Sequence, residues 1–418
     1  MPEIAPFRAY YYNVKNRAEL ESLVAPPHDI ISPAEKNFFF KRNPDNIVRI
    51  ILPDSYQKAA QILNIWIRNK RLLQHPSPAL YLYETKFHYN NQELTRYGLV
   101  ALVKLTEFSE KQIIPHEKTF EKVTEGRLNL FRATNANFNP IFFIFKGPNG
   151  YSHILQKYLA LKPFLMARDS EGVEHALYLI DSPQDIAEIQ NYFKNIPLVI
   201  ADGHHRYSSA LAYSRQGGSK YVLGLLVDIK NPGLLVFPTH RLIRYIPTLR
   251  PSQILEKVQR YFDVASFPFT RTDLNEKLRY LLSQMKIKSR NAFGVLFYNG
   301  STFYVICLKK EISPASLIQK NYSDAWKRLD VSILHEFLFN RLLKIPQEFD
   351  DTENIIYTKN LKEAIKTVQL GLYQALFILN PTKVEDIIAI TSNSEIMPHK
   401  STYFYPKPLS GLLIYKWD

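Results

Sequence analysis

Ile200-Ala201-Asp202-Gly203-His204-His205-Arg206 is the stretch that indicates the fold class of this sequence. It follows a short apolar run that begins at Pro197, and it precedes a helical pattern over Tyr207 to Arg215. The stretch therefore predicts a turn from a strand into a helix. Helical and strand patterns alternate through much of the chain, so we expect a mixed α/β protein.

The side chains of this turn suit a bound anion. A helix N-terminus presents free N–H groups and a partial positive charge. Gly203 permits a tight turn and the close approach of a ligand. Arg206 offers two N–H bonds to a phosphate, and His204 and His205 are donors that become charged near neutral pH. Asp202 suits a hydroxyl group or a divalent cation.

Two plainer interpretations of the turn stay open. In the first, Asp202 caps the helix and Gly203 makes the turn, with no further role. In the second, His204 and His205 bind zinc, although adjacent histidines rarely share one metal ion. No third ligand follows at a diagnostic spacing.

Composition limits the class of protein. With 418 residues the chain suggests about two to three domains, and its one cysteine, Cys307, points to a reducing compartment. Neither a signal-peptide pattern after Met1 nor an apolar run of membrane-spanning length is present. We therefore expect a cytoplasmic protein without a membrane partner. The net charge of +14 favours anionic partners or reflects genome composition, because the lysines are dispersed.

Periodicity predicts the main elements and three parts. We expect parts at 1–245, 246–380 and 381–418, the first a catalytic core, the second an α/β lobe and the third a segment returning to the catalytic cleft. Asn90-Asn91 predicts a turn between two strands. The predicted helices are Gln57–Leu73, Ser182–Asn195 and Tyr207–Arg215, and the predicted strands are Ala79–Tyr89, Arg96–Leu105, Pro140–Phe145, Pro197–Ala201, Tyr221–Asp228 and Leu234–Phe237.

A second candidate group surrounds Glu117, which follows Pro115 and His116. A kinase that phosphorylates an alcohol needs a base within reach of the hydroxyl group. It otherwise needs positioning and neutralisation of phosphate charge. The alternative is a solvated charge cluster, since Glu121, Lys122, Glu125 and Arg127 follow.

The stretch from Met397 to Lys407 gathers hydroxyl and ammonium groups between two prolines. Lys400, Ser401 and Thr402 suit a phosphate or carboxylate, and we expect the stretch to fold against the Asp202 loop. An edge strand of ordinary alternation is the alternative. Pro238-Thr239-His240-Arg241 is similar but shorter, and Arg8 is either a clamp for a substrate carboxylate or a buried partner of an acid.

Several standard sites are absent from the sequence. It has no Gly-x-x-x-x-Gly-Lys-Ser/Thr loop, no Gly-x-Gly-x-x-Gly and no Gly-x-Ser-x-Gly. These absences argue against ordinary P-loop kinases, Rossmann dehydrogenases and α/β-hydrolases.

Motifs along the whole chain resemble those of the prokaryotic family called domain of unknown function ten-fifteen. His28 departs from the aromatic residue expected at that position of the family. The motifs that carry the resemblance are Pro26–Ser32, Asn43–Arg49, Pro115–Thr119, Ala201–Arg206, Pro238–Arg241 and Met397–Lys407.

A narrower resemblance concerns the chemistry. Asp-Gly-His-His-Arg at a strand-to-helix turn, with Pro-His-Glu upstream, is similar to free serine kinases of the ParB/sulfiredoxin-like fold. The 85 residues from Glu117 to Asp202 exceed the spacing expected in those small kinases. The resemblance implies a ParB/sulfiredoxin-like core that transfers phosphate from ADP or ATP, with Mg²⁺, to a small hydroxylated metabolite. Free L-serine, giving O-phosphoserine, is the leading acceptor.

The resemblance also implies roles for residues. Glu117 would be the base and Asp202 a catalytic residue that helps to hold the metal or the hydroxyl group. Gly203, His204, His205 and Arg206 would bind the nucleotide phosphate. The expected substrate-binding residues are His116, Lys400, Ser401, Thr402 and Arg8.

Two other functions remain open. One is a nucleotide-gated, ParB-like DNA-binding protein, although no helix-turn-helix with a basic face is evident and we expect no nucleic-acid partner. Salt-sensitive retention on DNA would favour it. The other is a metal-dependent hydrolase that uses the histidines, which tightly bound zinc would favour.

Overall fold

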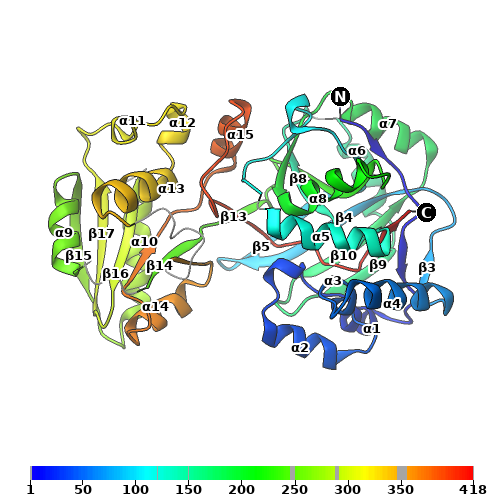
Figure 1. Cartoon of the computed structure of the whole chain (residues 1–418), viewed down its shortest axis with the longest axis horizontal. Helices are drawn as coiled ribbons and strands as arrows, with labels where there is room; N and C mark the ends of the chain where they lie inside the picture. The colour runs from blue at the N-terminus through cyan, green and yellow to red at the C-terminus, as the bar shows by residue number, and fades with distance from the viewer. Residues whose placement is uncertain are drawn as a thin grey trace. The chain divides into compact units, whose positions relative to one another are not determined.

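The computed structural model describes residues 2–119, 121–148, 150–244, 250–287, 291–345 and 355–417, without the side chains of 121–123. The chain forms two compact units. Unit 1 consists of Met1–Leu235 and Phe404–Asp418, and unit 2 is Val236–Tyr403 (Figure 1). The stretch expected as one part at 381–418 is thus divided between the units. The border expected after residue 245 lies outside the described residues.

Unit 1 is built on a nine-stranded mixed sheet. Most neighbouring strands are antiparallel, but β11 runs parallel to β6 and β12 runs parallel to β8. The strand order is β6 (Ile113–Ile114), β11 (Leu198–Asp202), β8 (Ile141–Phe145), β12 (Tyr221–Asp228), β5 (Gln92–Lys104), β4 (Leu80–Tyr89), β10 (Glu174–Ile180) and β9 (Leu165–Arg168), with β1 (Ile4–Ala5) paired to β5.

The helices of unit 1 bury apolar faces against this sheet. Phe143 of the sheet and Phe193 and Tyr207 of the helices are fully buried in one core, and burying such a side chain stabilises by about 1.5–3 kcal/mol. The helices are α1 (Arg17–Leu23), η1 (His28–Ile30), α2 (Pro33–Arg42), α3 (Val48–Ile51), α4 (Tyr56–Arg68), η2 (Phe108–Glu110), α5 (Glu121–Thr134), α6 (Ser152–Leu159), α7 (Pro183–Phe193) and α8 (His204–Ser214), and the short strands are β2 (Tyr10–Tyr12), β3 (Leu72–Gln74), β7 (Ala136–Asn137) and β21 (Tyr415–Lys416).

The expected hairpin is confirmed. Strands β4 and β5 pair antiparallel with Tyr89 opposite Gln92. Asn90 and Asn91 between them have φ of 51° and 62°, a left-handed conformation that asparagine tolerates. The expected helix over 182–195 is α7, which begins because the Ser182 side chain accepts from the backbone N–H of Asp185 and Pro183 follows.

Unit 2 has an antiparallel six-stranded sheet, partly covered by α10 and α14. Its order is β15 (Phe262–Pro268), β17 (Thr302–Leu308), β16 (Ala292–Phe297), β19 (Ala375–Ile378), β14 (His240–Ile243) and β18 (Ile355–Thr358). The chain passes from one unit to the other within β13 (Leu235–Phe237) and again within β20 (Tyr403–Tyr405), and these two strands pair. The helices are α9 (Pro251–Gln259), α10 (Leu274–Ile287), α11 (Pro314–Leu317), α12 (Asp324–Lys327), α13 (Asp330–Ser332), the π-helix η3 (Ile333–Leu342), α14 (Leu361–Gln369) and α15 (Val384–Ser392).

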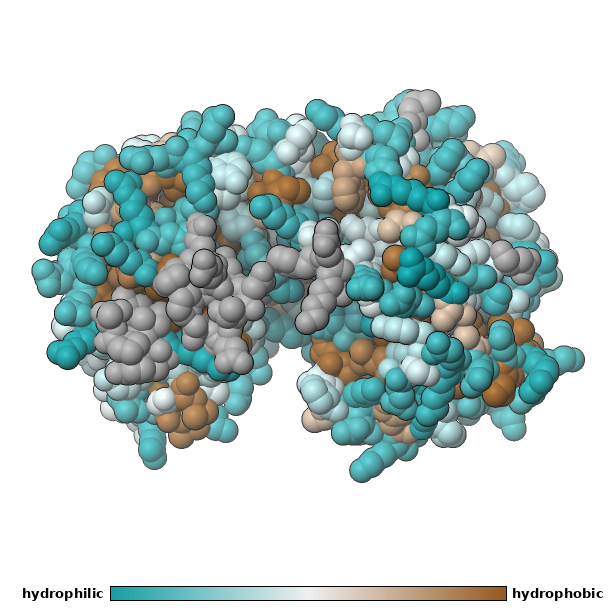
Figure 2. Space-filling view, in the orientation of Figure 1, coloured by the Kyte–Doolittle hydropathy of each residue, from teal (hydrophilic) through white to brown (hydrophobic). Residues whose placement is uncertain are grey.

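The surface seen in Figure 2 is largely hydrophilic, with hydrophobic residues in separate patches. Among the described residues, no helix combines the length and the apolar character needed to cross a bilayer. The architecture is therefore mixed α/β, with a large mixed sheet in unit 1, as the alternation of patterns predicts.

Candidate active site

The two motifs expected to carry chemistry meet at one edge of the unit 1 sheet. Strands β6 and β11 are parallel neighbours, with Ile113 opposite Leu198 and Ile114 opposite Val199. Because parallel strands bring their carboxyl ends to the same edge, Pro115–Glu117 and Asp202–Arg206 emerge side by side. A strand of two residues, β6, is thus enough to bring Glu117 to the loop that begins 85 residues later.

Gly203 is required at the start of α8. Its φ of 97° lies in the left-handed region, and it is the residue that precedes the first helical turn. A Cβ at this position would lie 2.9 Å from Cζ of Arg206. No side chain caps α8, so the alternative in which Asp202 caps the helix is wrong. The Asp202 carboxylate instead contacts two cationic side chains.

The carboxylate of Asp202 lies between Arg206 and Lys407. Arg206 donates from Nη2 to Oδ2 over 2.6 Å, and the ammonium group of Lys407 contacts Oδ1. The other end of the guanidinium donates from Nη1 to the carbonyl of Pro140 over 2.6 Å and to the side chain of Asn139. Arg206 therefore anchors Asp202 in this structure. To grip a phosphate it would have to exchange one of these partners, so its phosphate-binding role stays a prediction.

Lys407 joins a second carboxylate to this group. Its Nζ lies 3.8 Å from Oδ2 of Asp29, and its side chain is 7 % exposed. Burial disfavours the charged form, but Asp202 and Asp29 outweigh it and raise the pKa of Lys407 above 10.5. The Asp29 side chain is 41 % exposed. Its burial raises its pKa, yet Lys407, His28 and Arg206 bring that pKa below 3.8. Asp29 is therefore ionised at neutral pH beside a charged lysine.

Two buried histidines flank Glu117 with defined tautomers. Nε2 of His204 accepts the backbone N–H of His116 over 3.2 Å, which assigns its proton to Nδ1. That Nδ1 lies 3.8 Å from Oε2 of Glu117. His116 places its own Nδ1 2.6 Å from the carbonyl oxygen of Ile200, so this nitrogen is the donor. The two rings meet edge to face, with centroids 4.6 Å apart.

Burial keeps these histidines neutral. It lowers the pKa of His116 below 6.5 and, with help from His116, lowers the pKa of His204 well below 6.5. The expectation that His204 becomes a charged donor near neutral pH is therefore wrong. Its N–H instead faces Glu117, where it can orient the carboxylate. His205, the next residue of α8, is half-buried.

A family profile described as "Protein of unknown function (DUF1015)" matches residues 4–332. The chain belongs to this family. No curated protein shows a significant match.

Three solved structures resemble this DUF1015 protein distantly. A free serine kinase in complex with AMP has a TM-score of 0.35 at 14 % identity, over 72 % of this chain and 88 % of that chain. A truncated SbnI from Staphylococcus aureus has a TM-score of 0.35 at 12 % identity, over 74 % and 85 %. A conserved hypothetical protein from Pyrococcus furiosus has a TM-score of 0.33 at 13 % identity, over 71 % and 90 %.

The other expected substrate-binding residues are divided between the two units. Arg8, in unit 1, is exposed and donates from Nε to the carbonyl of His75 over 3.1 Å. Lys400, Ser401 and Thr402 belong to unit 2. The Met397–Lys407 stretch is therefore divided: Lys407 contacts Asp202, whereas a substrate role for the other three stays a prediction.

Within unit 2 the turn at Lys400 is held by Arg241, which is fully buried. Arg241 donates from Nη2 to the carbonyl of Lys400 over 3.1 Å and from Nε to Nε2 of His335 over 3.1 Å. Thr382 donates to the carbonyl of Ser401 over 3.0 Å. The Pro238–Arg241 motif and the start of the Met397–Lys407 stretch therefore form one structural cluster.

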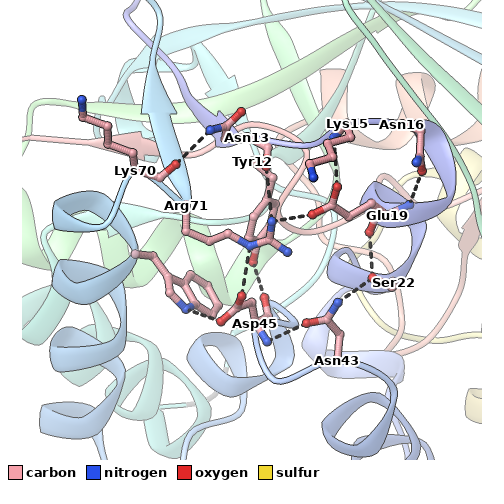
Figure 3. Close-up of polar contacts among 11 residues, drawn as sticks. Tyr12, Asn13, Lys15, Asn16, Glu19, Ser22, Asn43, Asp45, Lys70 and Arg71 are labelled. Carbon is pink, nitrogen blue, oxygen red and sulfur yellow. Dashed lines mark hydrogen bonds and ion pairs between the residues drawn. The ribbon is translucent and has the colours of Figure 1, made fainter.

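The Asn43–Arg49 motif is also structural. Asp45 accepts from Nε1 of Trp66 over 3.0 Å and lies 3.0 Å from Nε of Arg71 (Figure 3). Asn43 donates to the hydroxyl group of Ser22 over 2.7 Å. The motif thus ties α1 to α4 and to the start of β3.

Metal binding receives limited support from these side chains. The ranges described hold no group of three or more His, Cys, Asp or Glu suited to a metal ion, so the zinc-hydrolase alternative has no ligand set there. Mg²⁺ on a nucleotide needs only one or two protein carboxylates. Both oxygens of Asp202 face cations, and a metal there would have to displace one of them.

Sequence reasoning missed Asp29 and Asn139 as members of the group around Asp202, and it placed Lys407 in the stretch expected to fold against this loop without pairing it with Asp202. Each lies in a proline-flanked segment: Lys407 stands between Pro406 and Pro408, and Asn139 precedes Pro140. Asp29 falls in the Pro26–Ser32 motif. Charged or amide side chains next to prolines were therefore the available signal, but nothing local indicated that they belong to one network of contacts.

Proposed function

We propose that this protein is a small-molecule kinase that transfers a phosphoryl group from ADP or ATP to a hydroxyl group of a small metabolite, with free L-serine as the first acceptor to test. One observation carries the proposal. A carboxylate, Glu117, and a Gly-containing helix N-terminus, Gly203, meet at the same sheet edge through parallel strands. A base beside an anion site is the arrangement that phosphoryl transfer to an alcohol requires.

Each side chain of the site has a separate role in the proposed reaction. Glu117 takes the proton of the acceptor hydroxyl, and the N–H of His204, 3.8 Å away, keeps its carboxylate oriented. The acceptor oxygen bonds to phosphorus while the bond to the bridging oxygen breaks, so ADP yields AMP and ATP yields ADP. Lys407 and the N-terminus of α8 attract the phosphate. Bound Mg²⁺ would neutralise charge on the phosphates.

We further propose that unit 1 is a catalytic core of the ParB/sulfiredoxin-like type. Asp202 lies at the end of β11 in its sheet, and Phe404–Asp418 supplies Lys407 to the Asp202 group. Unit 2 holds the Arg241 cluster, and an additional contribution of Lys400, Ser401 and Thr402 to the acceptor belongs to the same proposal.

The test is a product search. The purified chain is incubated with ADP or ATP, Mg²⁺ and L-serine, and in parallel with a mixture of hydroxylated metabolites. Phosphorus NMR and mass spectrometry then look for a new phosphate ester. We expect O-phosphoserine or another phosphomonoester, formed in equal amount with AMP or ADP. Nucleotide hydrolysis to free phosphate without any ester would contradict the proposal.

A further inference from the structure

A cavity in unit 1 is lined in part by Arg206. Its other lining residues come mainly from α5, η1, α3 and the segment before β8, and α5 packs against α4 and α8 (Figure 1). None of its lining residues is acidic. Its volume of about 30 Å³ is room for about two or three water molecules, at about 10–15 Å³ each by the same measure. A ligand of only a few heavy atoms would fit.

Two guanidinium groups face this cavity. Arg206 is anchored to Asp202, but Arg127 makes one side-chain hydrogen bond, from Nη1 to the carbonyl of Ile51 over 3.0 Å, and no ion pair with a described carboxylate. Burial and the nearby Arg206 lower the pKa of Arg127 below 12.5. Two positive charges that face the same poorly hydrated cavity repel each other. An anion bound between them therefore lowers the electrostatic energy of both.

His28 adds a donor to the same cavity. Its ring lines the cavity, and burial together with Arg127 lowers the pKa of His28 below 6.5. A neutral imidazole still donates one N–H bond. Three side chains that line the cavity, those of Arg127, Arg206 and His28, can therefore donate hydrogen bonds. Asn139 also lines it and is held by hydrogen bonds of 3.1 Å to Pro408 O and to Ser410 Oγ.

Apart from Asn137, Asn139 and Ser410, the other lining residues are apolar. They include Leu130 and Phe131 from α5, together with Phe138 and Ile141. Apolar atoms there suit a short hydrocarbon chain and disfavour a fully hydrated dianion. The absence of an acidic lining residue disfavours an ammonium group. A carboxylate, with two oxygens in one plane, matches the fork of a guanidinium.

We propose that this cavity binds a short-chain carboxylate, with its head group at Arg127 and Arg206 and its carbon chain against Phe131 and Phe138. The site is a binding site separate from the Glu117 end, and the inference does not rest on phosphoryl transfer. Because Arg206 also anchors Asp202, the ligand would stabilise the loop from the opposite side.

The test compares ligands that have the same shape but differ in charge. The full chain, without nucleotide, is titrated calorimetrically and by thermal unfolding with acetate, propionate, inorganic phosphate, L-serine and propionamide, the neutral isostere of propionate. We expect propionate to bind and to raise the melting temperature, with acetate weaker. Equal effects of propionate and propionamide, or tighter binding of phosphate than of propionate, would overturn the proposal.

Substitutions locate the site. Arg127→Gln should weaken propionate binding by at least about tenfold, the scale of a hydrogen bond to a charged group. Arg132→Gln is the matched control, because Arg132 lies on the same helix but contacts Gln216 and Asn129 at the surface. Glu117→Gln should bind propionate like the wild type, which separates this inference from the kinase proposal. Unchanged binding by Arg127→Gln would refute the site, and if that variant does not fold, the propionate–propionamide comparison decides.

Discussion

The backbone N–H of His116 donates to Nε2 of His204 over 3.2 Å. This bond exists only while Nε2 is unprotonated, so it links the site to pH. Burial holds the pKa of His204 well below 6.5, whereas in the unfolded chain the imidazole takes up a proton near pH 6.5. The folded state therefore gains stability from a neutral His204 above pH 6.5 and loses it as the pH falls below that value.

We accordingly predict that the free energy of unfolding falls between pH 7.5 and pH 5. The contribution of His204 is up to about 1.4 kcal/mol per pH unit below 6.5. Urea unfolding at several pH values measures the slope, and His204→Gln should reduce it. His88→Gln is the control, since its side chain is 76 % exposed. An unaltered slope in the His204 variant would contradict the neutral, buried state.

Gly203→Ala should lower the free energy of unfolding more than Gly217→Ala, a substitution at another glycine of the same conformation. Both Gly203 and Gly217 have φ above 90°, so alanine at either position is strained by about 1–2 kcal/mol. Only at Gly203 would the new Cβ also meet Arg206, whereas nothing lies within 4 Å at Gly217. We expect Gly203→Ala to be the more destabilised in urea and to lose nucleotide binding. Equal destabilisation of the two variants would argue against the Arg206 contact.

Lys407→Met should destabilise unit 1 on the order of 3 kcal/mol, because it removes the buried cation that Asp202 and Asp29 share and leaves Asp202 with Arg206 alone. Lys104→Met is the surface comparison: its pair with Glu3 is about half exposed and should contribute less than about 1 kcal/mol. A double variant with Asp202→Asn should recover part of the loss. Additive effects in that cycle, measured by urea unfolding, would show that the two residues do not interact.

Glu117→Gln should abolish turnover while the fold and nucleotide affinity stay nearly intact. The change is close to isosteric, and a general base contributes about 10²–10⁴-fold. Glu125→Gln is the control, because Glu125 is exposed on α5. Steady-state rates with ADP or ATP give the comparison. Wild-type turnover in the Glu117 variant would assign this residue to a solvated cluster.

Local patterns were sufficient for the elements that depend on neighbours in sequence. The strand Tyr221–Asp228 has its predicted bounds, and Asn90-Asn91 forms the predicted turn. The helix expected at Tyr207 begins at His204, since Gly203 starts it earlier than the apolar pattern suggests. The strand-to-helix context of the Asp202 loop was therefore predictable.

Contacts between distant segments were not predictable from local patterns. Strand β6 has two residues, too few for any periodicity, yet its parallel pairing brings Glu117 to His204. Nothing near Arg241 or Lys400 in the sequence indicates that a buried guanidinium holds the distant turn. The burial that keeps His204 neutral likewise comes from the tertiary fold, so the sequence suggested a charged histidine.

Unit 1 is interrupted by unit 2, and this has a consequence for synthesis. Lys407 leaves the ribosome 205 residues after Asp202, a delay of roughly 10–40 s at about 5–20 residues per second. During that time Arg206 is the only one of the two cations available to Asp202. The nascent chain thus carries the Asp202 loop long before its second counter-ion is translated, and the ion-pair network forms only after all of unit 2 has been made.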